Sequence, residues 1–207
     1  MNRLQILLLS LFPIILWSII KPYDLELWIA ETFPLFIGLF ALIQTYKYFA
    51  LTTFTYTAIF IGGVLILVGA HYSYSHVPIG DWSKTFFGFE RNNYDKLGHF
   101  FQGFIATVVI KEVIYKKELV KSLKWTNFFA ISFAIALSAL YEILEWIVVS
   151  IFVIIDSKKP AINFLGEQGY IWDTQTDMFF ATVGALVFVL IFAKYHEAKA
   201  DLLNTKV

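Results

Sequence analysis

The sequence predicts an all-α membrane protein, a bundle of six transmembrane helices that forms a single transmembrane domain over residues 1–207. Three observations support this prediction. Of the 207 residues, 58% are hydrophobic and only 15% are charged, whereas a soluble domain is roughly half apolar and a quarter charged. Six apolar runs have about the 20 residues that an α-helix needs to cross a bilayer. Polar or charged turns separate these runs, so we expect the lipid bilayer to be the main partner of the chain.

The six expected spans cover, in chain order, residues 4–20, 27–46, 54–72, 97–115, 126–155 and 174–193. The first follows Arg3 as the core of a secretory signal would. No small-residue cleavage site comes after it, which favours an uncleaved signal-anchor. Glu31 and Pro34 lie in the first turns of the second span, and the third span ends in a segment rich in His and Tyr.

The connecting segments differ in character. Residues 78–94 are expected to form a polar loop, and residues 116–124 a basic one. Residues 156–171 carry a Lys-Lys-Pro sequence and glycines, which mark a further loop. The fifth span is longer than a bilayer needs, which predicts a tilt or a projection beyond the membrane.

The distribution of Lys and Arg predicts the orientation. Ten of the 16 lie on the side of the two termini, and six lie on the other side. The richer side is expected to be cytoplasmic, which places both termini in the cytoplasm. No strongly basic run suggests a nucleic-acid partner. The chain has no cysteine, which excludes disulfides, thiolate metal ligands and cysteine nucleophiles.

Ionisable and polar residues gather at one level of the predicted bundle. With the termini inside, 12 of the 16 acidic residues lie in the outer half of the membrane or in the outer loops. Ionisable groups are costly inside a membrane, so by default they indicate a functional site. The candidate site residues are Glu31, His71, Asp95, His99, Glu142, Glu145, Gln168, Asp173 and Asp177.

Helical spacing pairs several of these residues. Asp95 and His99 are four residues apart and share a helix face, so the carboxylate is expected to fix the tautomer of the imidazole. Asp173 and Asp177 are also four apart, although Asp173 could be a first-turn acid that the helix dipole favours. The carboxylates could instead be structural, as hydrogen-bonded links between helices.

His99, Glu142 and Asp177 come from three consecutive spans, so we expect them to meet. An imidazole with carboxylates suits zinc or another divalent metal, with these three residues as ligands. Glu142 should lie roughly 10 Å below the outer boundary, deeper than Glu145. It is therefore expected to have the specific role, with Glu145 supporting it. The sequence contains no His-Glu-x-x-His, Gly-x-Ser-x-Gly or phosphate-loop motif.

Three functions remain open at this point. In the first, the protein is an envelope enzyme or binding protein for a lipid-linked or membrane-proximal substrate, with His99 as general base or metal ligand and Glu142 and Asp177 beside it. In the second, it is a proton- or cation-coupled carrier. Against this stands the expected lack of ionisable groups in the inner half of the bundle. In the third, the polar groups only tie helices together, against which stands the excess of carboxylates over nearby bases.

Five motifs resemble those of the YjdF-like family of bacterial inner-membrane proteins, whose function is unknown. They are Glu31-x-x-Pro34, Gly69-Ala70-His71-Tyr72, Tyr94-Asp95-x-Leu97-Gly98-His99, Tyr141-Glu142-x-x-Glu145-Trp146 and Trp172-Asp173-Thr174-Gln175-x-Asp177. The resemblance implies a multi-pass protein of the bacterial inner membrane. More distantly, Lys96-Leu97-Gly98-His99, Glu142 and Asp177 with Gly184 are similar to the pattern of VanZ-like membrane proteins, which would imply a role in the cell envelope.

Overall fold

The computed structural model describes residues 1–155 and 168–204, which form helices and connecting turns and contain no strand. This confirms the predicted all-α class. The helices are α1 (Arg3–Ile19), α2 (Leu25–Thr45), α3 (Thr53–Tyr72), α4 (Pro78–Phe87), α5 (Tyr94–Lys116), α6 (Leu123–Ile155), α7 (Asp173–Val187) and α8 (Ala193–Asn204), with a π-helical segment, Phe188–Phe192, between the last two.

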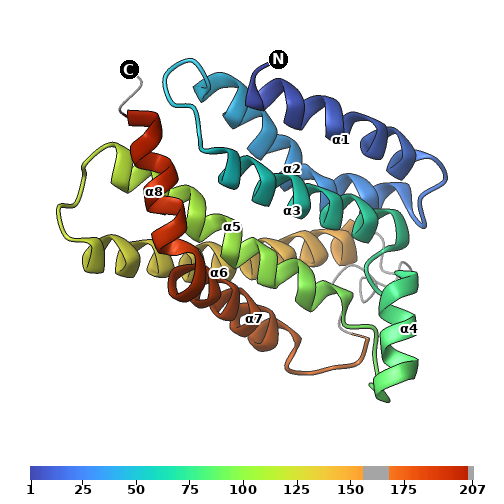
Figure 1. The fold of residues 1–207 in the computed structure, drawn as a ribbon. Helices are drawn as coiled ribbons and strands as arrows, with labels where there is room; N and C mark the ends of the chain where they lie inside the picture. Colours follow the sequence, from blue (N-terminus) through green and yellow to red (C-terminus); the bar gives the residue numbers. More distant parts are fainter. Residues whose placement is uncertain (156–167, 205–207) are drawn as a thin grey trace.

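The helices form two layers (Figure 1). In the first, α3 packs against α1 and α2; in the second, α5 packs against α6 and α7. Contacts between α3 and α5 join the layers. Local sequence explains where the first layer's helices begin, because the Asp24 carboxylate caps α2 at the Glu26 amide (2.8 Å) and Thr52 caps α3 at the Thr55 amide (3.2 Å).

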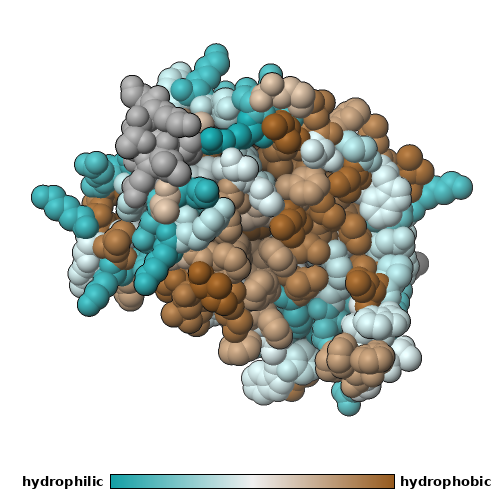
Figure 2. Space-filling model, viewed as in Figure 1, coloured by the Kyte–Doolittle hydropathy of each residue, from teal (hydrophilic) through white to brown (hydrophobic). Residues whose placement is uncertain are grey.

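Five helices of the described chain are long and apolar enough to cross a membrane: α2, α3, α5, α6 and the continuous stretch Asp173–Ala200. The predicted count of six spans is therefore not reached. The difference is α1, whose 17 residues cover only about 26 Å against a hydrocarbon core of about 30 Å. The surface agrees with a membrane protein, because hydrophobic side chains cover most of the middle of the face seen in Figure 2 and hydrophilic ones lie mainly toward its edges.

Two segments differ from the loops and spans that the sequence predicted. The expected polar loop over residues 78–94 contains a helix, α4, which lies across one end of the bundle (Figure 1). The expected sixth span, residues 174–193, continues through the π-helical segment into α8. Most of the expected loop over residues 156–171 lies outside the described residues.

Helices α5 and α7 pack extensively against each other, and glycines allow their backbones to approach closely. A Cβ atom on Gly103 would overlap the backbone carbonyl of Ala181, and one on Gly184 would overlap the carbonyl of Phe100. Any larger residue would force the helices apart, since backbone atoms cannot move aside as a side-chain end can. This contact brings the polar residues at the start of α5 beside those at the start of α7.

Candidate functional site

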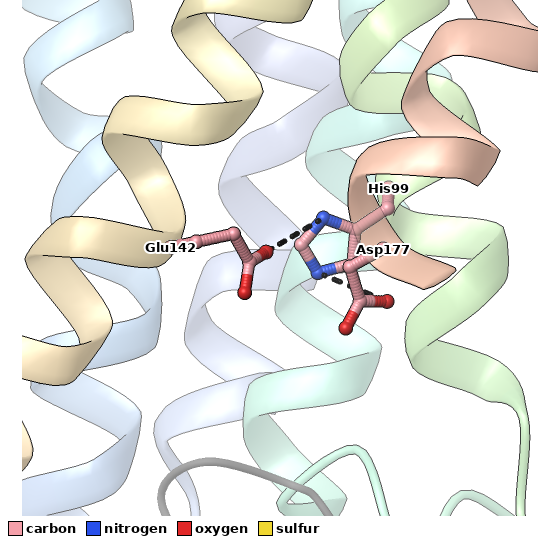
Figure 3. Close-up of side chains that lie close together, drawn as sticks. All are labelled: His99, Glu142 and Asp177. Atoms are coloured by element: carbon pink, nitrogen blue, oxygen red, sulfur yellow. Dashed lines mark ion pairs between the residues drawn. The ribbon is translucent and has the colours of Figure 1, made fainter. Parts of the chain in front are cut away.

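His99, Glu142 and Asp177 meet between α5, α6 and α7 (Figure 3). Nδ1 of His99 lies 3.7 Å from Oε1 of Glu142, and Nε2 lies 3.6 Å from Oδ1 of Asp177. One ligand atom from each residue can be chosen so that all three lie within 4.8 Å of one another. The prediction that these three side chains meet is therefore confirmed, while their role stays a prediction.

The imidazole of His99 is oriented by its own helix and by α6. Its Nδ1 lies 3.1 Å from Oε1 of Gln102, one turn further along α5, and its ring meets the Tyr141 ring edge to face at 5.9 Å. An amide oxygen only accepts hydrogen bonds, so this contact fits the tautomer of the imidazole that has its proton on Nδ1 and its lone pair on Nε2. Nε2 is the ring nitrogen that faces Asp177. The expectation that Asp95 would orient the imidazole is wrong, since Gln102 takes this place.

Asp95 instead belongs to an ion-pair network with Arg91, Lys96 and Asp173. Arg91 donates to Asp95 at 2.6 Å and to Asp173 at 2.5 Å. Lys96 donates to Asp173 at 2.5 Å and to Asp177 at 2.8 Å. These side chains are all nearly buried. Asp177 thus links the network to His99, and Lys96 fixes its position. Asp173 is therefore more than a first-turn acid.

Gln168 lies at the edge of this network and joins two segments that are far apart in the sequence. Its amide accepts from the Asn92 backbone N–H (3.0 Å) and donates to the Asn92 carbonyl (2.9 Å). The Asn92 side chain in turn donates to the Val77 carbonyl (3.0 Å) and to the Asp81 carboxylate (2.9 Å). Asn92, directly before α5, thus connects α4 to the segment that leads into α7.

Glu31 and Glu145 lie on the side of the site toward Tyr74. Glu31 is buried, and its Oε2 accepts no hydrogen bond in the described chain. Ser73 and Tyr74 adopt left-handed backbone conformations (φ 57° and 45°) and turn the Tyr74 ring back onto Gly69 and Gly98. Burial raises the pKa of the Tyr74 phenol well above its ordinary value, and the nearby carboxylates of Glu31 and Glu145 raise it further. The phenol is therefore neutral at physiological pH and can donate a hydrogen bond.

His71, also expected in the site, makes its described contacts elsewhere. Its Nδ1 lies 3.0 Å from the Ser18 carbonyl, and its ring packs on Trp17 at 4.4 Å between centroids. These contacts tie the end of α3 to the end of α1. No described contact brings His71 to His99.

The structure also contains a buried polar cluster at the other end of α5, in the half of the bundle that was expected to lack ionisable groups. The Glu112 carboxylate accepts hydrogen bonds from the Thr52 amide (2.6 Å), the Thr55 hydroxyl and Lys116 (2.6 Å), and it pairs with Nε2 of His196 (3.1 Å). Close by, the fully buried Lys111 binds Glu197 at 2.6 Å and Asn127. The expected lack of ionisable groups in this half is therefore wrong.

The missed cluster had one signal in the sequence. Glu112 and Lys116 are four residues apart on α5 and so share a helix face. Its other partner, His196, follows the predicted end of the sixth span and becomes part of the cluster only because the helix continues into α8.

The chain has been compared with protein families and with known proteins. A family model described as "Predicted membrane protein (DUF2238)" matches residues 3–198. The chain is 37% identical over 188 residues to "Inner membrane protein YjdF" of Escherichia coli (strain K12), which covers 91% of this chain and 88% of that protein. No solved structure matches. The YjdF-like resemblance and a multi-pass location in the inner membrane are thus confirmed, whereas the VanZ-like resemblance gains no support.

Proposed function

The chain belongs to the DUF2238 family of membrane proteins, and from this premise we propose that His99, Glu142 and Asp177 hold one divalent cation, zinc being the best fit. The protein would use it as an envelope enzyme or binding protein for a lipid-linked or membrane-proximal substrate. When bound, such a cation supplies Lewis acidity or an activated water.

The observation that carries this proposal is the state of Glu142. Its residue is 8% exposed, and Oε1 accepts no hydrogen bond although it faces the His99 imidazole. A buried carboxylate oxygen without a partner costs about 1–3 kcal/mol or more when charged. A cation bound between Glu142, His99 and Asp177 would remove this cost.

Distances in the site support the fit. Zinc binds nitrogen and oxygen ligands at about 2.0–2.2 Å in a tetrahedron, so neighbouring ligand atoms lie roughly 3.3–3.6 Å apart. The separation between Nε2 of His99 and Oδ1 of Asp177 is 3.6 Å. Glu142 faces Nδ1 in the structure, and its free Oε1 allows the carboxylate to turn toward Nε2.

Charge balance points the same way. The site and its network contain four carboxylates, from Asp95, Glu142, Asp173 and Asp177, against two permanent cations, Arg91 and Lys96. A divalent cation would neutralise the excess. The second trio with metal-ligand spacing, Asp95, Asp173 and Asp177, fits a metal less well because Lys96 already lies within 3.4 Å of each of its carboxylates.

The test is elemental analysis of purified protein that has been loaded with zinc and then freed of excess metal. We expect about one zinc per chain, and a loss of at least tenfold in affinity for H99A, E142Q and D177N. E145Q is the matched control, since it removes a neighbouring glutamate of the same helix. Zinc binding that is unchanged in the three variants, or absent from the loaded wild type, contradicts the proposal.

The buried cluster around Glu112 favours a second candidate, a proton- or cation-coupled carrier. With this cluster, ionisable groups lie toward both ends of α5. His99 and Glu112 are 13 residues apart, which is about 20 Å along the helix. A carrier should take up protons or cations into proteoliposomes, and both E112Q and E142Q should abolish this uptake. Absence of uptake by the wild-type protein speaks against the carrier, and uptake that survives both changes speaks against a pathway through Glu112 and Glu142.

A further inference from the structure

Helix α4 exposes an apolar face that its surroundings do not cover. Ile79, Trp82, Phe86 and Phe87 are each at least 60% exposed, and Phe89 follows directly after the helix at 47%. Trp82 stacks on Phe86 at 5.2 Å between centroids, and Phe87 stacks on Phe89 at 5.5 Å. The exposed side chains therefore form one continuous surface, which we call the aromatic face.

The helix is two-sided. Ile79, Trp82 and Phe86 follow the i, i+3, i+7 spacing of one helix face. On the side toward the bundle, Gly80 packs so closely on Asn92 that a Cβ atom would overlap the Asn92 side chain. Asp81 on this side binds the Asn92 amide. The sequence thus fixes which face of α4 meets the protein and leaves the aromatic face outward.

The position of α4 is bounded by two spans. Five residues separate it from the end of α3, and six separate it from the start of α5. Because both spans meet the same surface of the membrane, α4 cannot leave that surface by more than roughly 20 Å even with an extended connection. It also runs across the spans rather than along them (Figure 1).

We propose that α4 is an interfacial helix, and that its aromatic face lies in the headgroup and upper acyl region of the leaflet on the side of the site. Trp and other aromatic side chains favour this layer, where an amphipathic helix lies parallel to the membrane plane. The bilayer is the chosen occupant because short connections join α4 to α3 and α5, two helices that are long and apolar enough to cross it.

This placement sets the level of the candidate site. The side chain of Asn92 donates to Val77 and Asp81 at the start of α4. The preceding residue, Arg91, donates to Asp95 and Asp173 of the ion-pair network. An α4 fixed at the headgroups therefore fixes the start of α5, and with it the ion-pair network, at the lipid–water boundary. The inference does not depend on a metal at His99.

The test uses the absence of cysteine from the chain. An environment-sensitive fluorophore is attached to Phe86→Cys. Thr85→Cys is the matched control, because the preceding residue points about 100° away around the helix axis. Both side chains are exposed. The labelled proteins are placed in nanodiscs of phosphatidylethanolamine and phosphatidylglycerol, with and without lipids that carry a doxyl quencher. Melting of each variant is compared with wild type so that a folding defect is recognised.

We expect blue-shifted emission and strong doxyl quenching at position 86, and emission near that of the free dye with weak quenching at position 85. Equal, water-like emission at both positions would overturn the proposal, because the aromatic face would then lie in solvent. Blue-shifted emission at position 86 without doxyl quenching would also overturn it, since a second copy or another protein surface would then cover the face.

Discussion

Oε1 of Glu142 lies 3.7 Å from Nδ1 of His99 and accepts no hydrogen bond from the described residues. On its other side the same imidazole faces Asp177 at 3.6 Å. The imidazole is thus buried between two carboxylates. Lys96 binds that of Asp177, whereas Oε1 of Glu142 stays without a hydrogen-bond donor. The unsatisfied oxygen is the reason to look for function here.

The first prediction concerns Glu142→Gln, which keeps the shape of the side chain and removes its charge. We expect the melting temperature to stay the same or rise, because the change removes a buried carboxylate whose Oε1 has no hydrogen-bond partner in the described chain. Zinc content, or any phenotype found for deletion of the gene, should be lost. Glu145→Gln should keep both. A damaging Glu145→Gln beside a silent Glu142→Gln would show that the roles are reversed.

Lys96→Met should destabilise the fold by about 3–5 kcal/mol, since it leaves Asp173 and Asp177 buried without their ammonium partner. Adding Asp177→Asn to this variant should recover part of the loss. Thermal unfolding in detergent measures both. A double variant no more stable than Lys96→Met alone would mean that the lysine acts through its packing and not through its charge.

Gly103→Ala should cost about 1–3 kcal/mol, because the added methyl group overlaps the Ala181 carbonyl and forces α5 away from α7. Gly38→Ala is the matched control. A Cβ atom there meets nothing within 4 Å, and alanine favours the helix by about 1 kcal/mol. Equal melting temperatures for the two variants would contradict the close packing of the helices.

Glu112→Ala should release α8, since this carboxylate joins His196 of α8 to Thr52 and Thr55 at the start of α3. Limited proteolysis should then cut the C-terminal helix earlier than in wild type. Glu118→Ala, in the following turn, is the control and should leave the digestion pattern unchanged. A pattern that stays the same in Glu112→Ala would show that apolar contacts alone hold α8.

Single cysteines test the orientation predicted from the Lys and Arg distribution. In spheroplasts, a membrane-impermeant maleimide should label Glu90→Cys, whereas Ser122→Cys should react only after permeabilisation. Asn2→Cys shows whether α1 crosses the membrane. It should be protected like Ser122→Cys if both termini are cytoplasmic, and it should react from outside if α1 does not span. Labelling of Ser122→Cys alone would invert the orientation.

Much of this architecture could be read from the sequence, because the apolar runs are about as long as a membrane-spanning helix and the polar residues within them stand out. The meeting of His99 with Glu142 and Asp177 followed from three consecutive spans with polar residues at a similar depth. The partner of His99 could not be foreseen. Both Asp95 and Gln102 are within one turn of it, and only the position of Arg91 and Lys96 decides which of them turns away.

The remaining differences have physical causes as well. Helix α4 is ten residues long and mixes Asp and Lys with aromatic residues, so it gave no apolar run, although Pro78 at its start is a helix-initiation signal. The cluster around Glu112 depends on helix continuation through residues 188–192, which hydropathy does not report. Helix α1 has only 17 residues. That number is the lower end of what a membrane-spanning helix needs, so its length alone did not exclude it as a span.

The glycine contacts between α5 and α7 divide the candidate site into a fixed part and an adjustable part. With Gly103 against Ala181 and Gly184 against Phe100, neither helix can slide along the other without a backbone clash. The separation of His99 from Asp177 is therefore set by the register of the two helices. Glu142 comes from α6, which is not part of this interlocked pair. A movement of α6 would therefore change the distance between His99 and Glu142 and leave the distance between His99 and Asp177 unchanged.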